Sequence, residues 1–242
     1  IRNNKAFYNV AGIESENSSN VEIYGNEAYE NISGLLIFNL PELTVYGSNV
    51  NAHHNKIYNN NLTNFAVKGS IVSAVPKGAG VIIMATKDVK FHNNIIEDHK
   101  TVNLAVVSYE IFAADEDELG QETLASEAQA RGLRAIESDY KEDESYNPYP
   151  GRVSIHDNTF SNINFLPTFS NEFGLLWLLK NKASIPDIAY DGIISPDGSL
   201  QDDEHRLCVR NNSNASFVYL DASHDFEGFT SDRTPFECKL NE

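Results

Sequence analysis

The sequence predicts a right-handed parallel β-helix, an all-β solenoid with three short strands in each turn. Two observations lead to this fold. First, a six-residue phrase recurs along the chain, and every copy alternates apolar and variable residues with the period of a strand. Second, the first complete repeat, from Asn4 to Asn26, spans only 22 residues, too few for two parallel strands joined by a crossover helix.

The phrase consists of a branched apolar residue, a variable residue, a second apolar residue, a variable residue, a small or polar residue, and Asn. Its copies are 21–26, 50–55, 89–94, 153–158 and 207–212, and residues 1–4 match the end of another copy. All copies can bury the same face only if they stack in parallel and in register, which winds the chain into a coil. Further strands of the turns are expected to begin at Gly12, Gly34 and Gly80.

The chain is expected to form a single domain over 1–242, with insertions at about 113–150 and 164–204, where the copies of the phrase are furthest apart. Residues 115–144 contain eleven acidic and three basic side chains. No Asp-x-Asp-x-Asp-Gly spacing marks a calcium loop there, so a solvated face or a docking patch for a basic partner is favoured. We expect a surface helix over 118–131, and an apolar stretch, 173–179, that packs across the flank or the end of the coil.

The Asn that ends each phrase is interpreted as structural. Asn tolerates the left-handed backbone of a tight corner, and stacked carboxamides can hydrogen-bond from one turn to the next. The alternative is contact with a glycan, which is disfavoured because inward corner positions are hidden in such a stack. The residues are Asn4, Asn26, Asn55, Asn94, Asn158 and Asn212.

The outward residue just before each corner defines the candidate site. In chain order these residues are Arg2, Tyr24, His53, His92, His156 and Arg210. Neighbouring strands lie about 4.8 Å apart, so the histidines form a column that could hold an anionic sugar or a metal ion. Parallel stacking points the imidazoles alike instead of toward one centre, which disfavours a metal, and three exposed imidazoles on a solvated strand are the alternative to any ligand role.

The predicted binding residues are therefore Tyr24, His53, His92, His156 and Arg210, and the sequence assigns no catalytic residue, metal ligand or cofactor. An enzyme working in a groove beside the histidine column would need a base, or a carboxylate pair, near a sugar ring. Asp98, His99 and Lys100 could supply a base, an orienting group and a stabilising charge, but a charged turn is the favoured interpretation. No GxSxG, HExxH or P-loop motif is present.

Composition and charge disfavour several functions. The 18 basic and 35 acidic residues give a net charge of −17, which repels nucleic acid and anionic lipid. No apolar run approaches the roughly 18 residues of a membrane-spanning helix. Hydrophobic residues make up 41% of the chain, enough for a core, so intrinsic disorder is disfavoured. Cys208 and Cys238 are compatible with a disulfide in an oxidising compartment, or with two unrelated reduced thiols.

Several segments carry a family resemblance. They are NEAYENISG (26–34), FNLP (38–41), NN (60–61), NFA (64–66), VPKGAG (75–80) and TPFEC (234–238). With them the chain resembles the bacterial parallel β-helix repeat proteins, and most closely an exported group often encoded beside a diheme c-type cytochrome. It is similar, more distantly, to the β-helices of polysaccharide lyases and epimerases, but it lacks the YGxDPH-like signature of mannuronan epimerases.

The resemblance implies a periplasmic, cell-surface or secreted protein whose partner is a c-type cytochrome or another envelope protein. A disulfide between Cys208 and Cys238 would then hold the C-terminal segment over the last turn and cover its open edge. The expected function is a non-catalytic binding or scaffold module for a partner protein or a polysaccharide. The alternative is a carbohydrate-active enzyme, of lyase or epimerase type.

Overall fold

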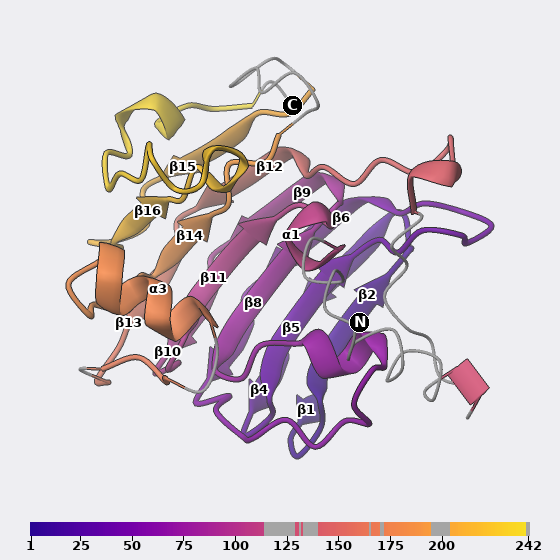
Figure 1. Ribbon diagram of the computed structural model, residues 1–242. Helices are drawn as coiled ribbons and strands as arrows, with labels where there is room; N and C mark the ends of the chain where they lie inside the picture. Colours follow the sequence, from indigo (N-terminus) through magenta and orange to yellow (C-terminus); the bar gives the residue numbers. More distant parts are fainter. Residues whose placement is uncertain are drawn as a thin grey trace.

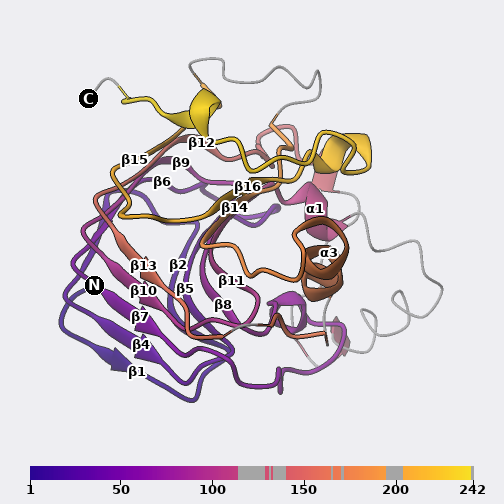
Figure 2. The same ribbon diagram turned by 90° about the vertical axis from the view of Figure 1, so that its left-hand side faces the viewer.

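The computed structural model describes residues 1–113, 129–130, 132, 140–164, 166–169, 172–194 and 204–240. In this part of the chain the backbone winds into a coil whose strands form three parallel sheets, here named A, B and C (Figure 1). Successive turns add strands to the sheets in the order A, B, C. Residues far apart in the sequence therefore lie one above another along the coil (Figure 2).

The strands are short, as expected. Sheet A contains β3 (Val21–Tyr24), β6 (Ser48–His53), β9 (Lys87–His92), β12 (Gly151–His156) and β15 (Leu207–Arg210). Sheet B contains β1 (Lys5–Ala6), β4 (Glu27–Tyr29), β7 (Lys56–Tyr58), β10 (Ile95–Glu97) and β13 (Thr159–Ser161). Sheet C contains β2 (Ala11–Glu16), β5 (Ser33–Phe38), β8 (Ala79–Met84), β11 (Val102–Val107), β14 (Ile188–Tyr190) and β16 (Phe217–Tyr219).

The core lies inside the coil and is made of equivalent side chains stacked from turn to turn. Val21, Val50, Val89 and Val153 pair in register across sheet A. The last three of these valines are buried, while Val21 is partly buried and packs against the same cluster. This stacking confirms that the recurring phrase is one face of a solenoid, because the period-two alternation sends the first and third residues of every copy inward.

The Asn residues that end the phrases form the expected ladder. The Nδ2 of each amide donates to Oδ1 of the amide in the next turn, at 2.9–3.0 Å, through Asn4, Asn26, Asn55, Asn94, Asn158 and Asn212. The left-handed backbone, however, belongs to the residue before the ladder Asn: φ is 63° at Gly25, 53° at His54 and 53° at Asn93. Our assignment of that conformation to the ladder Asn itself was wrong. The corner residue turns the chain, and the ladder amide is free to point inward.

A second ladder runs along the corner between sheets B and C. The Nδ2 of Asn31 donates to Oδ1 of Asn60 at 2.9 Å, and the Nδ2 of Asn60 meets Nε2 of His99 at 3.1 Å. The ladder packs against the glycines that begin the strands of sheet C. A Cβ built on Gly34 would lie 2.8 Å from the Nδ2 of Asn60. These glycines thus leave room for the ladder.

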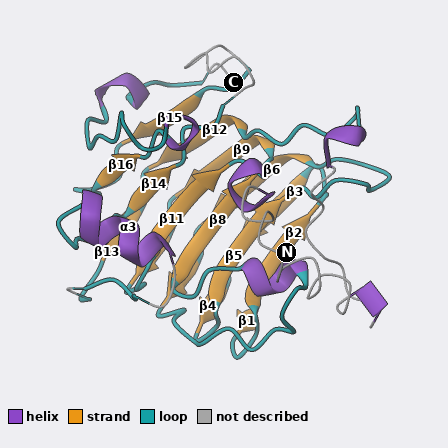
Figure 3. Ribbon diagram, viewed as in Figure 1, coloured by secondary structure: helices purple, strands orange, loops and turns teal. Residues whose placement is uncertain are grey.

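The outer face of sheet C is covered. Apolar side chains of this face, among them Leu36, Ile82 and Val107, form a second core with aromatic residues from the insertions. Helices α1 (Glu110–Ala113) and α3 (Glu172–Lys180) lie over this face (Figure 3). Short 3-10 turns occupy Ile71–Ala74, Tyr140–Glu142, Ala222–His224 and Thr234–Phe236.

The structure bears differently on the three predictions for the insertions. The apolar stretch 173–179 lies within α3 and packs on the flank of the coil through Phe173 and Trp177. The helix expected over 118–131 lies almost entirely outside the described residues, as does most of the acidic segment 115–144. The region 164–204, which we took for one insertion, contains β14 of sheet C. This strand has only three residues, which is too few to display a repeat.

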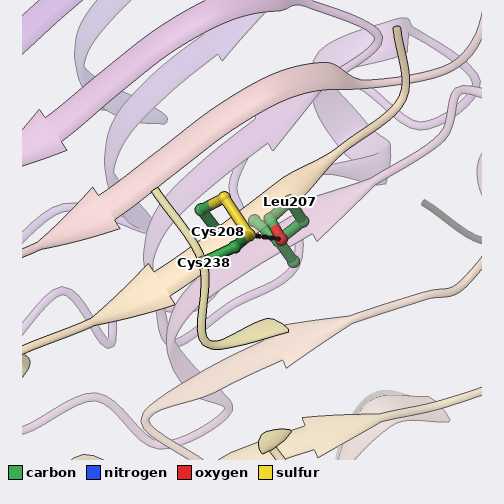
Figure 4. Close-up of a disulfide and its surroundings, with 3 residues drawn as sticks. All are labelled: Leu207, Cys208 and Cys238. Carbon is green, nitrogen blue, oxygen red and sulfur yellow. Dashed lines mark hydrogen bonds between the residues drawn. A yellow bond between two sulfur atoms is a disulfide. The ribbon is translucent and has the colours of Figure 1, made fainter. Parts of the chain in front are cut away.

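The C-terminal segment closes the last turn. Phe236 is buried against the rings of Phe217, Tyr190 and Tyr219, at centroid distances of 5.0, 5.8 and 5.8 Å. Cys208 and Cys238 form a disulfide, so of the two alternatives left open by the sequence the structure has the disulfide (Figure 4). The segment crosses the edge of sheet A at β15, as the resemblance implied.

Candidate functional site

The outer face of sheet A carries three columns of side chains. Strand register aligns the middle column: Glu22, Asn51, Lys90, Ser154 and Cys208. It also aligns the predicted column, Tyr24, His53, His92, His156 and Arg210, and Arg2 pairs with Tyr24 below it. The third column consists of the residues just before the first four complete phrases, which have positive φ: Asn20, Asn49, Asp88 and Arg152.

The predicted column is a stack of rings. Tyr24 and His53 lie 5.3 Å apart with planes 6° apart, His53 and His92 lie 5.2 Å and 19° apart, and His92 and His156 lie 5.0 Å and 2° apart. Since the rings are nearly parallel, their nitrogens do not converge on one point. No group of three His, Cys, Asp or Glu side chains among the described residues is placed to hold a metal ion.

The ring nitrogens show why His156 differs from the other two histidines. The Nε2 of His53 faces Oε1 of Glu22 at 3.2 Å, and the Nε2 of His92 faces Oδ1 of Asn51 at 3.0 Å. Both acceptors belong to the middle column, one turn below. The residue one turn below His156 in that column is Lys90, which carries no acceptor. The described residues accordingly give Nε2 of His156 no hydrogen-bond partner.

The other nitrogen of His156 is fixed by a carboxylate. Its Nδ1 lies 2.7 Å from Oδ2 of Asp157, and this hydrogen bond lowers the pKa of Asp157 below its ordinary value. Because the carboxylate accepts a hydrogen bond from Nδ1–H, a neutral His156 carries its lone pair on Nε2. The site therefore offers one imidazole nitrogen to a ligand.

A groove of about 230 Å³ lies beside His156 on the C-terminal half of sheet A. Its lining is Asn49, Asp88, Lys90, Arg152, Ser154, His156, Arg210, Lys239 and Leu240. Lys90, Arg152, Arg210 and Lys239 against Asp88 give a formal charge of +3 when His156 is neutral. The whole chain has a charge of −17, so the groove is a cationic site on an acidic protein.

The two arginines of the groove are held differently. The Nε of Arg152 donates to Oδ1 of Asp88 at 2.7 Å. The Nε of Arg210 is buried and has no hydrogen-bond partner in the described part of the chain. The small side chain of Ser154 is buried and forms part of the lining.

The outer faces of the other two sheets differ from this one. Sheet C is covered by the insertions. On sheet B the cations are paired, since Lys5 lies 3.0 Å from Glu27 and Lys56 lies 3.6 Å from Glu97. Sheet A is therefore the open face on which positive charge exceeds negative charge.

Asp98, His99 and Lys100, which the sequence also singled out, do not lie in the groove. His99 is fully buried in the second ladder, where Nδ1 meets Oδ1 of Asn103 at 2.8 Å and burial lowers its pKa to about 4. Asp98 and Lys100 flank it in a turn, as favoured. Sequence reasoning missed Arg152 and Lys239. The residue before each phrase could have revealed Arg152, because Asp88 occupies the same position one copy earlier.

Comparison with known proteins bears on the fold. Residues 1–115 match the family model described as "Right handed beta helix region". This match and the three parallel sheets together show the fold, a right-handed parallel β-helix. Neither a curated protein nor a solved structure matches the chain. No helix in the described part of this β-helix protein is long and apolar enough to cross a membrane.

Proposed function

We propose that this β-helix protein is a non-catalytic binding module for an acidic glycan, and that the groove on sheet A is its binding site. The observation that carries the proposal is the cationic groove itself, with its formal charge of +3 beside His156. A carboxylate or sulfate of the glycan would pair with Lys90 and Arg210 and would accept a hydrogen bond from Nε2 of His156 when the imidazole is charged. Bonds of this kind are about twice as strong as neutral ones.

The shape of the site supports a glycan over a protein partner. The groove encloses about 230 Å³, which suits sugar units or another small ligand better than a flat protein surface. The predicted column runs along the coil axis, so an extended chain laid on it meets an imidazole at three successive turns, His53, His92 and His156. Uronic-acid polysaccharides have this periodic, charged form.

The test is direct binding to polysaccharides of known charge. Isothermal titration calorimetry with polygalacturonate, and with a neutral polysaccharide as reference, should show binding of the anionic polymer only. Lys90→Ala and Arg210→Ala should each weaken binding about tenfold, since each removes an ion-paired hydrogen bond worth about 1.5 kcal/mol or more. Lys5→Ala is the matched control, because this lysine is 65% exposed and paired on sheet B.

Salt separates the local site from the charge of the whole molecule. If the groove holds the polyanion, added salt weakens binding because it screens close ion pairs. Were the net charge of −17 to dominate, salt would strengthen any association instead. Binding that rises with salt, that is equal for the neutral polysaccharide, or that survives both groove substitutions would refute the proposal.

A second function is favoured by one observation, the pairing of His156 with Asp157 next to Arg210. In a polysaccharide lyase of this geometry, Nε2 of neutral His156 would remove the proton next to the uronate carboxylate. The electron pair would form a carbon–carbon double bond, and the glycosidic oxygen would leave with a proton from solvent. Unsaturated ends absorb in the ultraviolet, so appearance of this absorbance, and its loss in His156→Ala, would assign an enzyme and exclude the non-catalytic proposal.

We also propose an extracytoplasmic location. The Cys208–Cys238 disulfide supports it, because structural disulfides persist in oxidising compartments. The c-type cytochrome partner expected from the resemblance rests on the acidic segment 115–144, most of which lies outside the described residues. A pull-down with the immobilised protein and its variant lacking 115–144 tests that expectation separately from glycan binding.

A further inference from the structure

The C-terminal segment reaches the groove by a route that its core contacts do not explain. Phe236 is its anchor in the core and packs 5.0 Å from the ring of Phe217. Arg233 adds a hydrogen bond from Nη1 to the carbonyl of Ala215 at 3.3 Å. These contacts close the end of the coil. They would be equally satisfied if the chain beyond Phe236 pointed into solvent.

The disulfide instead holds the segment on the outer face of sheet A, where the groove lies. Cys208 belongs to the middle column of outward positions on sheet A, directly above Ser154 and two turns above Lys90. The register therefore places the cross-link on the outer face of sheet A, where it joins β15 to the C-terminal segment (Figure 4). Cys238, bound at this point, also contacts the carbonyl of Leu207, at 3.4 Å from its Sγ.

The two residues after the cross-link line the groove. Lys239 is exposed and Leu240 is partly buried, and both face the cavity that Lys90 and Arg210 border. Lys239 supplies one of the four formal cations, and it comes from a segment that is not part of any strand. Apart from the cross-link and the contact of Cys238 with Leu207, the described hydrogen bonds and ring contacts between this segment and the coil lie at or before Phe236.

We propose that residues 238–240 are a wall of the anion-binding groove, that Lys239 contacts the ligand, and that the Cys208–Cys238 disulfide is the device that positions it. This inference rests on the proposed function and adds to it a ligand contact and a covalent requirement. A merely stabilising cross-link would strengthen the fold but would leave the affinity of the folded protein unchanged.

The test compares four proteins for binding to polygalacturonate: wild type, Lys239→Ala, the double variant Cys208→Ser/Cys238→Ser, and the triple variant. Lys239→Ala and the double variant should each weaken binding about fivefold to tenfold. The triple variant should be no weaker than the double variant, because both changes remove the same contact. Lys239→Arg should retain most of the affinity, and Lys56→Ala on sheet B is the control for a lost charge.

Reduction of the disulfide gives a second experiment, which uses the wild-type chain. Dithiothreitol converts the disulfide to two thiols and is itself oxidised to a cyclic disulfide. Reduced wild type should bind as weakly as the double variant, and reductant should not alter the affinity of the double variant. Circular dichroism on each sample shows that the coil is intact, and Lys239→Ala leaves the cross-link in place.

The outcomes separate this inference from the proposed function. Unchanged affinity of Lys239→Ala in a protein that still depends on Lys90 and Arg210 would refute the inference and leave the groove as the site. A weaker double variant combined with an unaffected Lys239→Ala would also refute it, because the cross-link would then act through the fold. Absence of any binding by wild type would overturn both proposals.

Discussion

Replacement of His99 by Asn should remove a defined share of the acid sensitivity of this protein. His99 occupies the second ladder at the position held by Asn60 in the turn below. Its Nε2 accepts from the Nδ2 of Asn60 at 3.1 Å, and its Nδ1 donates to Oδ1 of Asn103 at 2.8 Å. The buried ring is therefore neutral. A second proton would place a charge in the buried interior and would set the new Nε2–H against the Nδ2 donor of Asn60.

The magnitude follows from the two pKa values. Burial lowers the pKa of His99 from 6.5 to about 4 in the folded protein. The unfolded chain binds the proton more readily, so the stabilisation is fully present above the unfolded pKa and is lost as the pH falls from about 6.5 to about 4. A difference of this size corresponds to about 3 kcal/mol in the free energy of unfolding.

The assay is urea unfolding of wild type and His99→Asn at pH 7 and at pH 4.5. The quantity compared is the difference in the free energy of unfolding between the two proteins at each pH. Titrations that the two proteins share cancel in this difference. On acidification, wild type should lose up to about 3 kcal/mol more than the variant. Exposed His54→Asn is the matched control and should behave like wild type. Parallel pH profiles for wild type and His99→Asn, or an NMR titration of His99 near pH 6.5, would show that the reasoning is wrong.

Four further outcomes are expected. Burial raises the pKa of Asp191 to about 7, so its contribution to stability is lost as the pH rises from about 4 through 7. Over this range the free energy of unfolding of wild type should fall by up to about 4 kcal/mol relative to that of Asp191→Asn, the opposite pH dependence to that of His99. Removing both cysteines should lower the free energy of unfolding, measured by urea titration, by about 3–4 kcal/mol. The reason is that the disulfide closes a 30-residue loop and so restricts the unfolded chain. Asn94→Ala removes the link between the amides of Asn55 and Asn158 and leaves the backbone N–H of Asn55 without its acceptor, so it should cost about 2–4 kcal/mol in the same assay. Gly34→Ala should destabilise more than Gly132→Ala: a Cβ on Gly34 would meet Ile57 at 2.4 Å, whereas a Cβ on Gly132, whose φ of 73° strains any side chain, meets no described atom within 4 Å.

The titrations of His99 and Asp191 oppose each other between about pH 4 and 6.5. In that window the unfolded state gains a proton at the histidine, and the folded state holds one at the aspartate. Their effects on the wild type therefore largely cancel. The single variants are needed to reveal either one.

The sequence by itself determined the coil and its first ladder. Each copy of the phrase carries its own strand alternation and its own Asn, so the pattern is local and repeats wherever the chain passes the same corner. It also placed Tyr24 and the three histidines in one column, because in-register stacking follows from the need of Val50 and Val89 to share a core.

Only the tertiary structure decided where charge gathers and which polar residues are hidden. Lys90, Arg152 and Lys239 come from three distant parts of the chain, and the insertions between them have no pattern that fixes where their ends return. The burial of His99 depends on strand register and on the space above Gly80, whose Cβ would lie 2.6 Å from the ring. Periodic hydrophobic burial is a property of neighbouring residues, whereas electrostatic neighbours are set by the path of the whole chain.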